Sequence, residues 1–572
     1  MKYLHGFFLL IALTLGFQST VTAQTGNFTW GGVASSNWTS TTNWAGTTSG
    51  GVPLLLRFPG VHSVTGSGNN VNDLATFTNG VGSADIGIAF PGTLSVGAIN
   101  LASGSRNIGN SSAATSGTLT LNGAGSGFSV AAKTLLSVGT SGSTLRVRDV
   151  ASGAGTQTMS VNFGISDGII DIVTGSSVII DSVIKGGNGF IKSGGGSLRL
   201  TGENTFNGLM TINAGTVQVG QGGQTGRISG NVQINGGALE FNNGASTGFS
   251  RTFGGDTAGV GSVNHGGTAG PGSESLLQVT GAWSHAGGTT IAGGNGVLSI
   301  GNGGMLGSIV GNIAITNSTA NLRFNKSDSL TYNGQVSGSG GVQQVGSGST
   351  ILTNSSSYSG QTVVSNGSLT VNGTLSNTNV TVASISNAST LGGTGEINGA
   401  VLIGANGTLS PGDLAPGGSL GNLKTGNLSF LNDSTFKFEF NSITGSSDWV
   451  NVNGNLSLTG DVALQISDLG SSMSRFSLIS YRGTWNGGVF QGLDNLDRFS
   501  IGGRQWQIRY DDVYSGVNGG MYSNFVTISA VPEPSSLAML SVVSAIPLVG
   551  RYLKRKRTGK NTDAASTPEN EV

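Results

Sequence analysis

The chain contains Ser197-Leu-Arg-Leu-Thr-Gly-Glu-Asn-Thr-Phe-Asn-Gly208 and, 152 residues later, Ser349-Thr-Ile-Leu-Thr-Asn-Ser-Ser-Ser-Tyr-Ser-Gly360. The match continues without a gap, because Gly215 and Val217 lie over Gly367 and Leu369. With a third, weaker copy, the repeats are clearest at residues 191–220, 276–301 and 343–372. Such self-similarity is typical of architectures in which each unit stacks on the next.

Short segments with alternating hydrophobic residues fill these repeats. Examples are Gly230-Asn-Val-Gln-Ile-Asn-Gly236 and Gly367-Ser-Leu-Thr-Val-Asn-Gly373. An apolar residue at every second position is the pattern of a strand with one buried face. The flanking Gly and Asn residues tolerate a positive φ at tight bends. Between residues 24 and 530 the sequence shows no helical periodicity longer than a turn or two.

Strands this short cannot bury a core alone, so the next unit must cover each of them. The sequence therefore predicts an all-β fold, a right-handed parallel β-helix (β-solenoid), over residues 81–440. In such a coil Val, Ile and Leu stack inward, while small polar residues stack at the bends. A string of β-sandwiches is the alternative, but it would need linkers between domains, and the sequence contains none.

The composition excludes several classes of protein. Of the 572 residues, 101 are Gly, 26 are Lys or Arg, 26 are Asp or Glu, and none is Cys. A net charge of zero argues against a nucleic-acid-binding surface, and the lack of Cys excludes a disulfide-linked scaffold. Because 36% of residues are hydrophobic, the chain does not resemble a disordered, highly charged polymer.

Aromatic residues mark both flanks of the predicted solenoid. Trp30, Trp38 and Trp44 fall within residues 24–80, which we interpret as an N-terminal cap, because the open end of a solenoid must be covered. A carbohydrate-stacking surface is the alternative for these tryptophans. Residues 441–530 are richer in charged and aromatic side chains, and we expect a C-terminal β-domain there.

Both ends of the chain have the pattern of targeting signals. Lys2, an apolar run over residues 7–17 and small residues up to Ala23 predict a signal peptide over residues 1–23, which signal peptidase cleaves after Ala23. Near the other end, a short motif precedes an apolar segment and then a basic cluster. The motif is Val531, Pro532, Glu533 and Pro534, and the cluster is Arg551, Lys554, Arg555, Lys556 and Arg557.

The apolar segment predicts a C-terminal helix that holds the chain in a membrane through residues 535–553. The basic cluster would keep its end on the cytoplasmic side of that membrane. A polar tail follows over residues 558–572.

The order of motif, apolar segment and basic cluster over residues 531–557 resembles the PEP-CTERM sorting signal of Gram-negative bacteria. The resemblance implies that a membrane exosortase recognises the Pro-Glu-Pro motif and cleaves there. It also implies an exported protein of the cell envelope, cell surface or extracellular matrix, anchored transiently or permanently. A plain tail anchor that stays uncut is the alternative.

The repeats resemble the autotransporter-associated β-strand repeat. Gly194-Gly-Gly-Ser-Leu-Arg-Leu-Thr-Gly202, Phe206-Asn-Gly208 and Asn213-Ala-Gly-Thr-Val-Gln-Val219 follow that family's pattern. The resemblance implies a surface-exposed passenger with a structural or adhesive role. Besides the export machinery, the expected partners are exopolysaccharide or other surface proteins.

Residues that could support catalysis are sparse. His285 takes the position of Phe206 and Tyr358 in the other copies, so we expect it to pack. No triad or metal-ligand spacing is present, and we expect no metal, cofactor or catalytic residue. However, Asp149 and Asp171 are 22 residues apart, which is about one coil. Two adjacent carboxylates would allow acid–base chemistry on a glycan, so the alternative to a non-enzymatic protein is a β-helix polysaccharide lyase or glycoside hydrolase.

Overall fold

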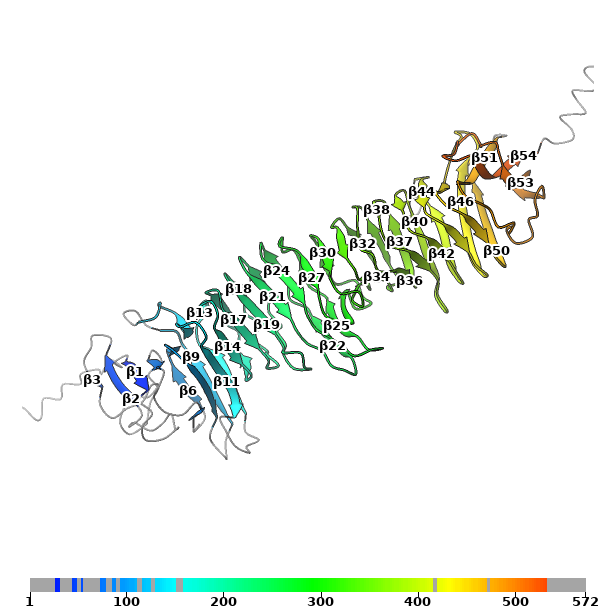
Figure 1. Ribbon diagram of the computed structural model, residues 1–572. Helices are drawn as coiled ribbons and strands as arrows, with labels where there is room; N and C mark the ends of the chain where they lie inside the picture. Colours follow the sequence, from blue (N-terminus) through cyan, green and yellow to red (C-terminus); the bar gives the residue numbers. More distant parts are fainter. Residues whose placement is uncertain are drawn as a thin grey trace, which may run out of the picture. The chain divides into compact units, whose positions relative to one another are not determined.

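The computed structural model describes residues 26–30, 44–48, 53–54, 73–78, 85–88, 93–110, 116–124, 129–150, 158–414, 419–470 and 474–531. Within these residues the regular secondary structure consists of β-strands, which confirms the all-β prediction. The chain divides into two units, Met1–Thr362 and Val363–Val572. Each unit is a stack of coils, and the strands of neighbouring coils pair mostly in parallel. Figure 1 labels these strands.

Three faces make up the coils of unit 1. The first face is a sheet of 13 described strands in the order β29 (Ser308–Ile309), β26 (Ala282–Trp283), β23 (Thr257–Gly259), β20 (Val232–Ile234), β18 (Met210–Ile212), β16 (Phe190–Ser193), β13 (Gly168–Ile172), β10 (Thr134–Val138), β7 (Ala98–Leu101), β4 (Leu74–Phe77), β1 (Gly26–Trp30), β2 (Trp44–Thr48) and β3 (Pro53–Leu54). The second face has 11 described strands, β33 (Val336–Gly338), β30 (Ile313–Ile315), β27 (Thr289–Ile291), β24 (Ser262–His265), β21 (Ala238–Phe241), β19 (Thr216–Val219), β17 (Ser197–Leu200), β14 (Ser177–Ile180), β11 (Thr144–Val150), β8 (Ser105–Asn110) and β5 (Asp85–Ile88).

The third face is discontinuous. Its early coils contribute β15 (Val183–Lys185), β12 (Met159–Phe163), β9 (Gly117–Leu121) and β6 (Thr93–Val96). Its later coils contribute β22 (Phe249–Phe253), β25 (Ser275–Val279), β28 (Gly296–Ile300), β31 (Asn321–Phe324) and β34 (Gly341–Gln344). A separate sheet contains the parallel pair of β32 (Ser329–Tyr332) and β35 (Ser349–Leu352). The boundary between the two units falls within β36 (Thr362–Val364).

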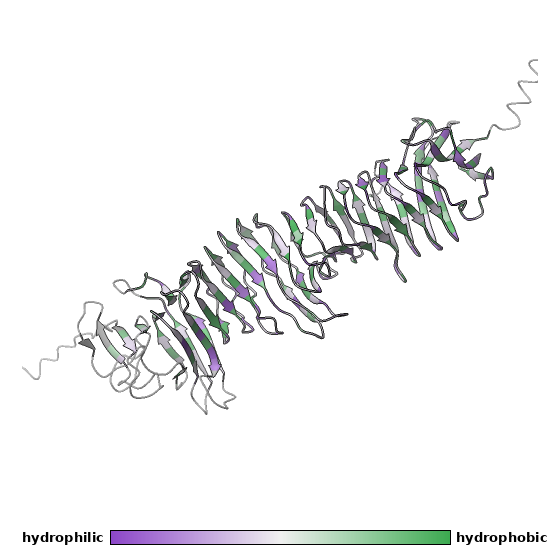
Figure 2. Cartoon of the chain, in the orientation of Figure 1, coloured by the Kyte–Doolittle hydropathy of each residue, from purple (hydrophilic) through white to green (hydrophobic). Residues whose placement is uncertain are grey.

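Alternating burial builds the core between these faces. Leu198 pairs in register with Val217, Val217 with Leu239, and Leu239 with Val263, and all four side chains are fully buried. Burying each such side chain contributes about 1.5–3 kcal/mol. Hydrophobic positions accordingly concentrate along the strands (Figure 2). The β-solenoid prediction is confirmed, while the handedness of the coil stays a prediction.

Coil length varies widely along unit 1. The step between register partners is 33 residues from Thr144 to Ser177, 19 from Arg199 to Gln218 and 26 from Thr252 to Gln278. Loops between the strands absorb these differences. The coil length of about 22 residues that the sequence suggested therefore does not apply to every coil.

The N-terminal tryptophans are packed together rather than exposed. Trp30 and Trp44 contact edge to face, with ring centroids 4.9 Å apart, and both lie against Phe77. All three side chains are buried, so they do not form an open platform for stacking sugars. Trp38 lies outside the described residues.

Unit 2 also stacks three faces. One contains β39 (Val380–Val382), β42 (Val401–Ile403), β45 (Leu428–Phe430) and β49 (Leu456–Leu458). The next contains β37 (Gly367–Val371), β40 (Ser389–Gly393), β43 (Gly407–Pro411), β46 (Ser434–Asn441) and β47 (Ser446–Ser447), and β50 (Val462–Asp468) pairs with β46. The last has the order β38 (Thr374–Leu375), β41 (Glu396–Ile397), β44 (Asn422–Thr425), β48 (Trp449–Val452), β51 (Arg475–Tyr481), β54 (Asn524–Ala530), β53 (Arg504–Asp512) and β52 (Arg498–Ile501).

Parallel pairing in unit 2 continues past residue 440. β45 pairs with β49, β46 with β50 and β48 with β51, all in parallel. Antiparallel pairing occurs in the short hairpin of β46 and β47 and then between β51 and β54. The coils therefore continue beyond residue 440, where the content of charged and aromatic residues rises. Each of these strands pairs with the strand of the preceding coil on which it stacks. Trp506 of β53 then packs edge to face on Phe440 and is fully buried.

Among the described residues, no helix has the length and hydrophobicity needed to cross a bilayer. The C-terminal apolar helix expected over residues 535–553 lies outside the described residues, as do the signal peptide and the polar tail.

Candidate functional site

Asp149 and Asp171 do not form a carboxylate pair. Asp149 lies on β11 of the second face, whereas Asp171 lies on β13 of the first. Asp171 pairs in register with Ser137 and Ser193, and the Ser193 hydroxyl donates to its Oδ1 over 2.7 Å. In the preceding coil, the residue in register with Asp171 is therefore Ser137 of β10, not Asp149. The coil between Ser137 and Asp171 contains more residues than the 22 that separate the two aspartates.

Charged side chains from the neighbouring coil surround Asp149 instead. Burial raises the pKa of Asp149, and nearby Asp181 adds to that shift while Lys185 opposes it. Asp181 also forms an ion pair with Arg146. Two carboxylates and two cations from adjacent coils thus gather here, and the carboxylate near Asp149 is Asp181, not Asp171.

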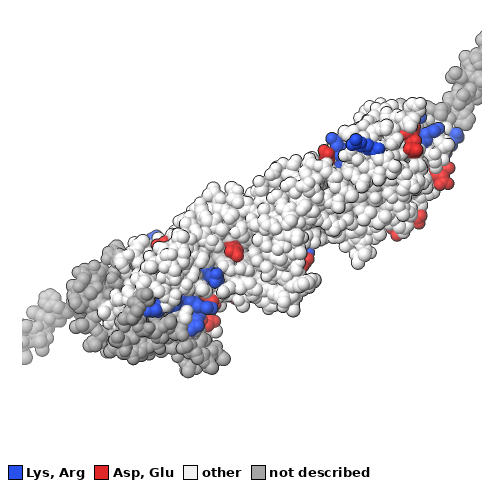
Figure 3. All heavy atoms as spheres, in the orientation of Figure 1, with Lys and Arg blue, Asp and Glu red and all other residues white. Residues whose placement is uncertain are grey.

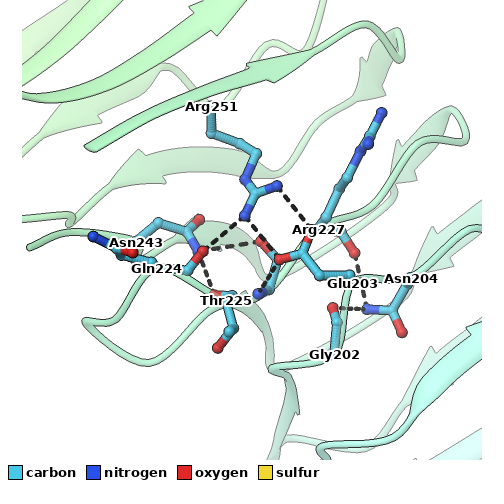
Figure 4. Close-up of polar contacts among 9 residues, drawn as sticks. Gly202, Glu203, Asn204, Gln224, Thr225, Arg227, Asn243 and Arg251 are labelled. Carbon is cyan, nitrogen blue, oxygen red and sulfur yellow. Dashed lines mark hydrogen bonds and ion pairs between the residues drawn. The ribbon is translucent and has the colours of Figure 1, made fainter.

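A second polar cluster joins three successive coils of unit 1 (Figure 4). Arg251 donates to both carboxylate oxygens of Glu203 over 2.8 Å and to the Gln224 carbonyl oxygen over 2.8 Å. The Gly226 backbone N–H donates to the same carboxylate over 3.2 Å, and the Arg251 guanidinium lies over the Phe249 ring. Bidentate Arg–carboxylate pairing of this kind is strong and directional. The cluster holds the loop at residues 220–226 against the coil.

Equivalent residues of the two clear repeats have equivalent hydrogen bonds. The Asn204 Oδ1 atom accepts the Ile184 N–H over 2.9 Å, and at the matching position of the later repeat Ser356 Oγ accepts the Val336 N–H over 3.0 Å. Both acceptors are buried. A buried backbone N–H that lost its partner would cost about 1–3 kcal/mol, so these side chains have a structural role that the sequence match did not reveal.

Lys192 and Gln344 also correspond, and both point into the coil. Lys192 Nζ donates to the carbonyl oxygens of Ser193 and Gly194 over 2.6 and 2.7 Å, and Gln344 Nε2 donates to that of Gly346 over 2.8 Å. Burial lowers the pKa of Lys192 to about 8. Each side chain supplies hydrogen-bond donors to the carbonyl groups of a Gly-rich bend.

The prediction that His285 packs is confirmed. Its side chain is fully buried, with Nδ1 2.8 Å from Thr257 Oγ1 and Nε2 3.0 Å from Thr289 Oγ1. Burial lowers the pKa of His285 to about 4. In the later repeat the Tyr358 hydroxyl contacts Thr362 over 2.6 Å, again a residue four positions ahead.

The remaining sequence-predicted positions are mostly outside the described residues. Of the sorting motif only Val531 is described, and its N–H donates to the Gln505 carbonyl over 2.9 Å. Ala23 lies outside, as do the other motif residues and the basic cluster: Pro532, Glu533, Pro534, Arg551, Lys554, Arg555, Lys556 and Arg557. Within the part of the chain that the structure describes, no three His, Asp or Glu side chains gather as metal ligands would.

Comparison with known families identifies the repeats. A model described as "Passenger-associated-transport-repeat" matches residues 190–219 and 342–371, which have the same offset as the two clear copies in the sequence. The chain therefore carries two passenger-type repeats, in agreement with the resemblance to autotransporter-associated β-strand repeats. The weaker copy at residues 276–301 is not part of these matches.

Known proteins that are similar to this chain include two adhesins. The adhesin BmaC autotransporter of Brucella suis biovar 1 (strain 1330) is 33% identical over 181 residues, which is 30% of this chain and 5% of that protein. The chain thus spans about one-twentieth of that relative's length. The crystal structure of the Haemophilus influenzae Hap adhesin is 13% identical, with a TM-score of 0.29, and the match covers 89% of this chain and 71% of that one.

Proposed function

We propose that this protein is an exported, surface-displayed adhesive β-solenoid that works by repeated weak contacts rather than by catalysis. The observation that carries the proposal is the pair of passenger-type repeats, which have matching internal hydrogen bonds. The similarity to an autotransporter adhesin supports the adhesive role. Contacts repeated along one chain raise overall avidity well above the affinity of any single contact.

The surface supports contact with neutral, hydroxyl-rich partners such as exopolysaccharide. Only 9% of the residues are charged, and the face drawn in Figure 3 shows a largely uncharged surface with a few small groups of charged side chains. Outward positions carry amides and hydroxyls, as in β18, where Thr211 lies in register with Gln233 of β20. Such side chains hydrogen-bond sugars without a net electrostatic attraction.

The proposal is tested with the purified chain on a glycan array and in cell-attachment assays. We expect binding to a subset of glycans that grows steeply with the density of immobilised sugar. Turnover of a polysaccharide, abolished by Asp149→Ala or Asp171→Ala, would instead establish the lyase or hydrolase alternative. Absence of binding to glycans and to cell surfaces at high protein density would refute the adhesive role.

We further propose that the segment after Val531 sorts the protein by an exosortase-type step. The support is the position of the motif, because β54 ends at Ala530 and cleavage beyond it would leave every described strand intact. Replacing Pro532, Glu533 and Pro534 by Ala should leave an uncut chain in the membrane, visible as a larger intact mass. Unchanged mass and unchanged surface display would exclude this sorting step.

A further inference from the structure

β50 is an edge strand at the end of unit 2 (Figure 1). It pairs in parallel with β46, and no other described strand pairs with it. The backbone N–H of Gln491, in a loop, donates to the Val462 carbonyl oxygen over 2.9 Å. This hydrogen bond covers the first residue of β50. No described strand is hydrogen-bonded to the outer backbone edge of the stretch from Ala463 to Asp468, although β52 lies close to β50. Such an edge is a template for pairing with another chain.

The core beneath this edge is incompletely covered. Phe436 and Phe438 of β46 are fully buried, but their register partners Leu464 and Ile466 on β50 are only half-buried. Two exposed apolar side chains extend the uncovered area, because Leu469 is 61% exposed and Ile443 is 68% exposed. Another strand laid along β50 would bury these groups and gain about 25 cal/mol for each Å² of apolar surface removed from water.

The other edge strands at this end of unit 2 are protected. The chain at residues 484–488 covers β49, since Leu456 N–H donates to the Thr484 carbonyl and Leu458 N–H donates to Asn486 Oδ1. β52 has four residues and begins with the exposed Arg498. Short strands, charge and covering loops are the usual means of preventing edge-to-edge association. β50 has seven residues, Val462-Ala-Leu-Gln-Ile-Ser-Asp468, and contains no Lys, Arg or Pro.

The sequence of β50 suits pairing with a second copy of itself. An antiparallel pair about a two-fold axis at Ile466 places Ile466 opposite the partner subunit's Ile466, and Gln465 opposite the partner subunit's Ser467. The outward side chains, Gln465 and Ser467, are then uncharged, and the same register places Asp468 opposite the partner subunit's Leu464. Asp468 is the charged residue of β50, and its carboxylate oxygens already accept hydrogen bonds from Ser442 and Gly470. No like charges therefore oppose one another across the axis.

We propose that two copies of this protein associate through antiparallel pairing of their β50 strands, which joins one face of each unit 2 into a continuous sheet. The contact is isologous, so it closes after two copies and forms a dimer rather than a fibre. A dimer presents two sets of passenger-type repeats from one particle, which doubles the contacts available for multivalent binding.

The absence of Cys from the chain allows a direct test by disulfide cross-linking. Ile466→Cys places one thiol opposite its own copy across the axis, and Ser429→Cys on the fully paired strand β45 is the matched control. The full chain, purified in mild detergent, is oxidised and analysed on non-reducing gels. We expect the Ile466→Cys variant to form the dimer at least tenfold more efficiently than the control variant. Equal yields would overturn the proposal.

Sedimentation velocity over a range of concentrations measures the same association without cross-linking. We expect the mass of the wild-type chain to double with concentration and Gln465→Lys to raise the dimer dissociation constant at least tenfold. Gln465 faces outward, so this variant retains the core, which circular dichroism can verify. Ser429→Lys should leave association unchanged. A wild-type chain that remains monomeric, or a Gln465→Lys variant that dimerises as well as the wild type, would overturn the proposal.

Discussion

Acidification should destabilise the coils around His285. The neutral imidazole is fully buried between Thr257 and Thr289, and burial lowers the pKa of His285 from 6.5 to about 4. In the unfolded chain the same imidazole takes up a proton below about pH 6.5. Between pH 6.5 and 4 the unfolded state therefore binds more protons, and the free energy of unfolding falls as the pH falls.

The magnitude follows from the two pKa values. At about 1.4 kcal/mol for each pH unit, the loss between neutral pH and pH 4 is about 3 kcal/mol for this residue. Burial also lowers the pKa of His265 in a neighbouring coil, which adds a further loss in the same direction. The stabilising contribution of the neutral His285 is fully present above pH 6.5 and declines as the pH falls toward 4.

The assay compares urea denaturation of wild type and His285→Tyr at pH 7 and pH 4. Tyr358 shows that a tyrosine fits this position and contacts the residue four places ahead. Tryptophan fluorescence follows unfolding, and the buried Trp283, with its ring centroid 5.7 Å from that of His285, is one of the seven tryptophans that contribute to it. We expect the variant to lose most of the pH dependence, with His285→Gln as a second non-titrating replacement. An equal change in unfolding free energy for the wild type and both variants would refute this reasoning.

Three further predictions concern individual positions. A Cβ atom at Gly208 would lie 2.0 Å from a backbone nitrogen of the neighbouring coil, so Gly208→Ala should lower the melting temperature strongly; Gly187→Ala, whose nearest contact is 3.8 Å away, should leave it nearly unchanged. Lys192→Met should cost about 1–3 kcal/mol in urea denaturation because it removes buried hydrogen bonds, whereas Lys192→Gln, the residue of the equivalent repeat position, should cost less. Burial raises the pKa of Asp448 to about 7, so the folded state keeps a proton that the unfolded state releases above about pH 4. The unfolding free energy of unit 2 should thus fall as the pH rises from 4 through 7, and Asp448→Asn should flatten that dependence; a slope unchanged in the variant would count against it.

Several features of the fold were accessible from the sequence because they depend on local patterns. Alternation at residues such as Leu198 and Leu200 determines which face of a strand is buried. The constant offset between the two clear copies identified the repeats, and the alignment of the weaker copy identified His285 as a packing position through its correspondence with Phe206 and Tyr358. These inferences require no knowledge of how many residues separate one coil from the next.

Tertiary structure decided everything that depends on the length of each coil. Asp171 stacks on Ser137, so Asp149 and Asp171 lie on different faces although their spacing in the sequence suggested one coil. Lys192 points inward, although its type favours the surface, because the carbonyl groups of a Gly-rich bend need donors. The uncovered edge at β50 likewise becomes visible only once pairing is known. Strand patterns are set by neighbouring residues, whereas loop lengths and long-range pairing fix which strands meet.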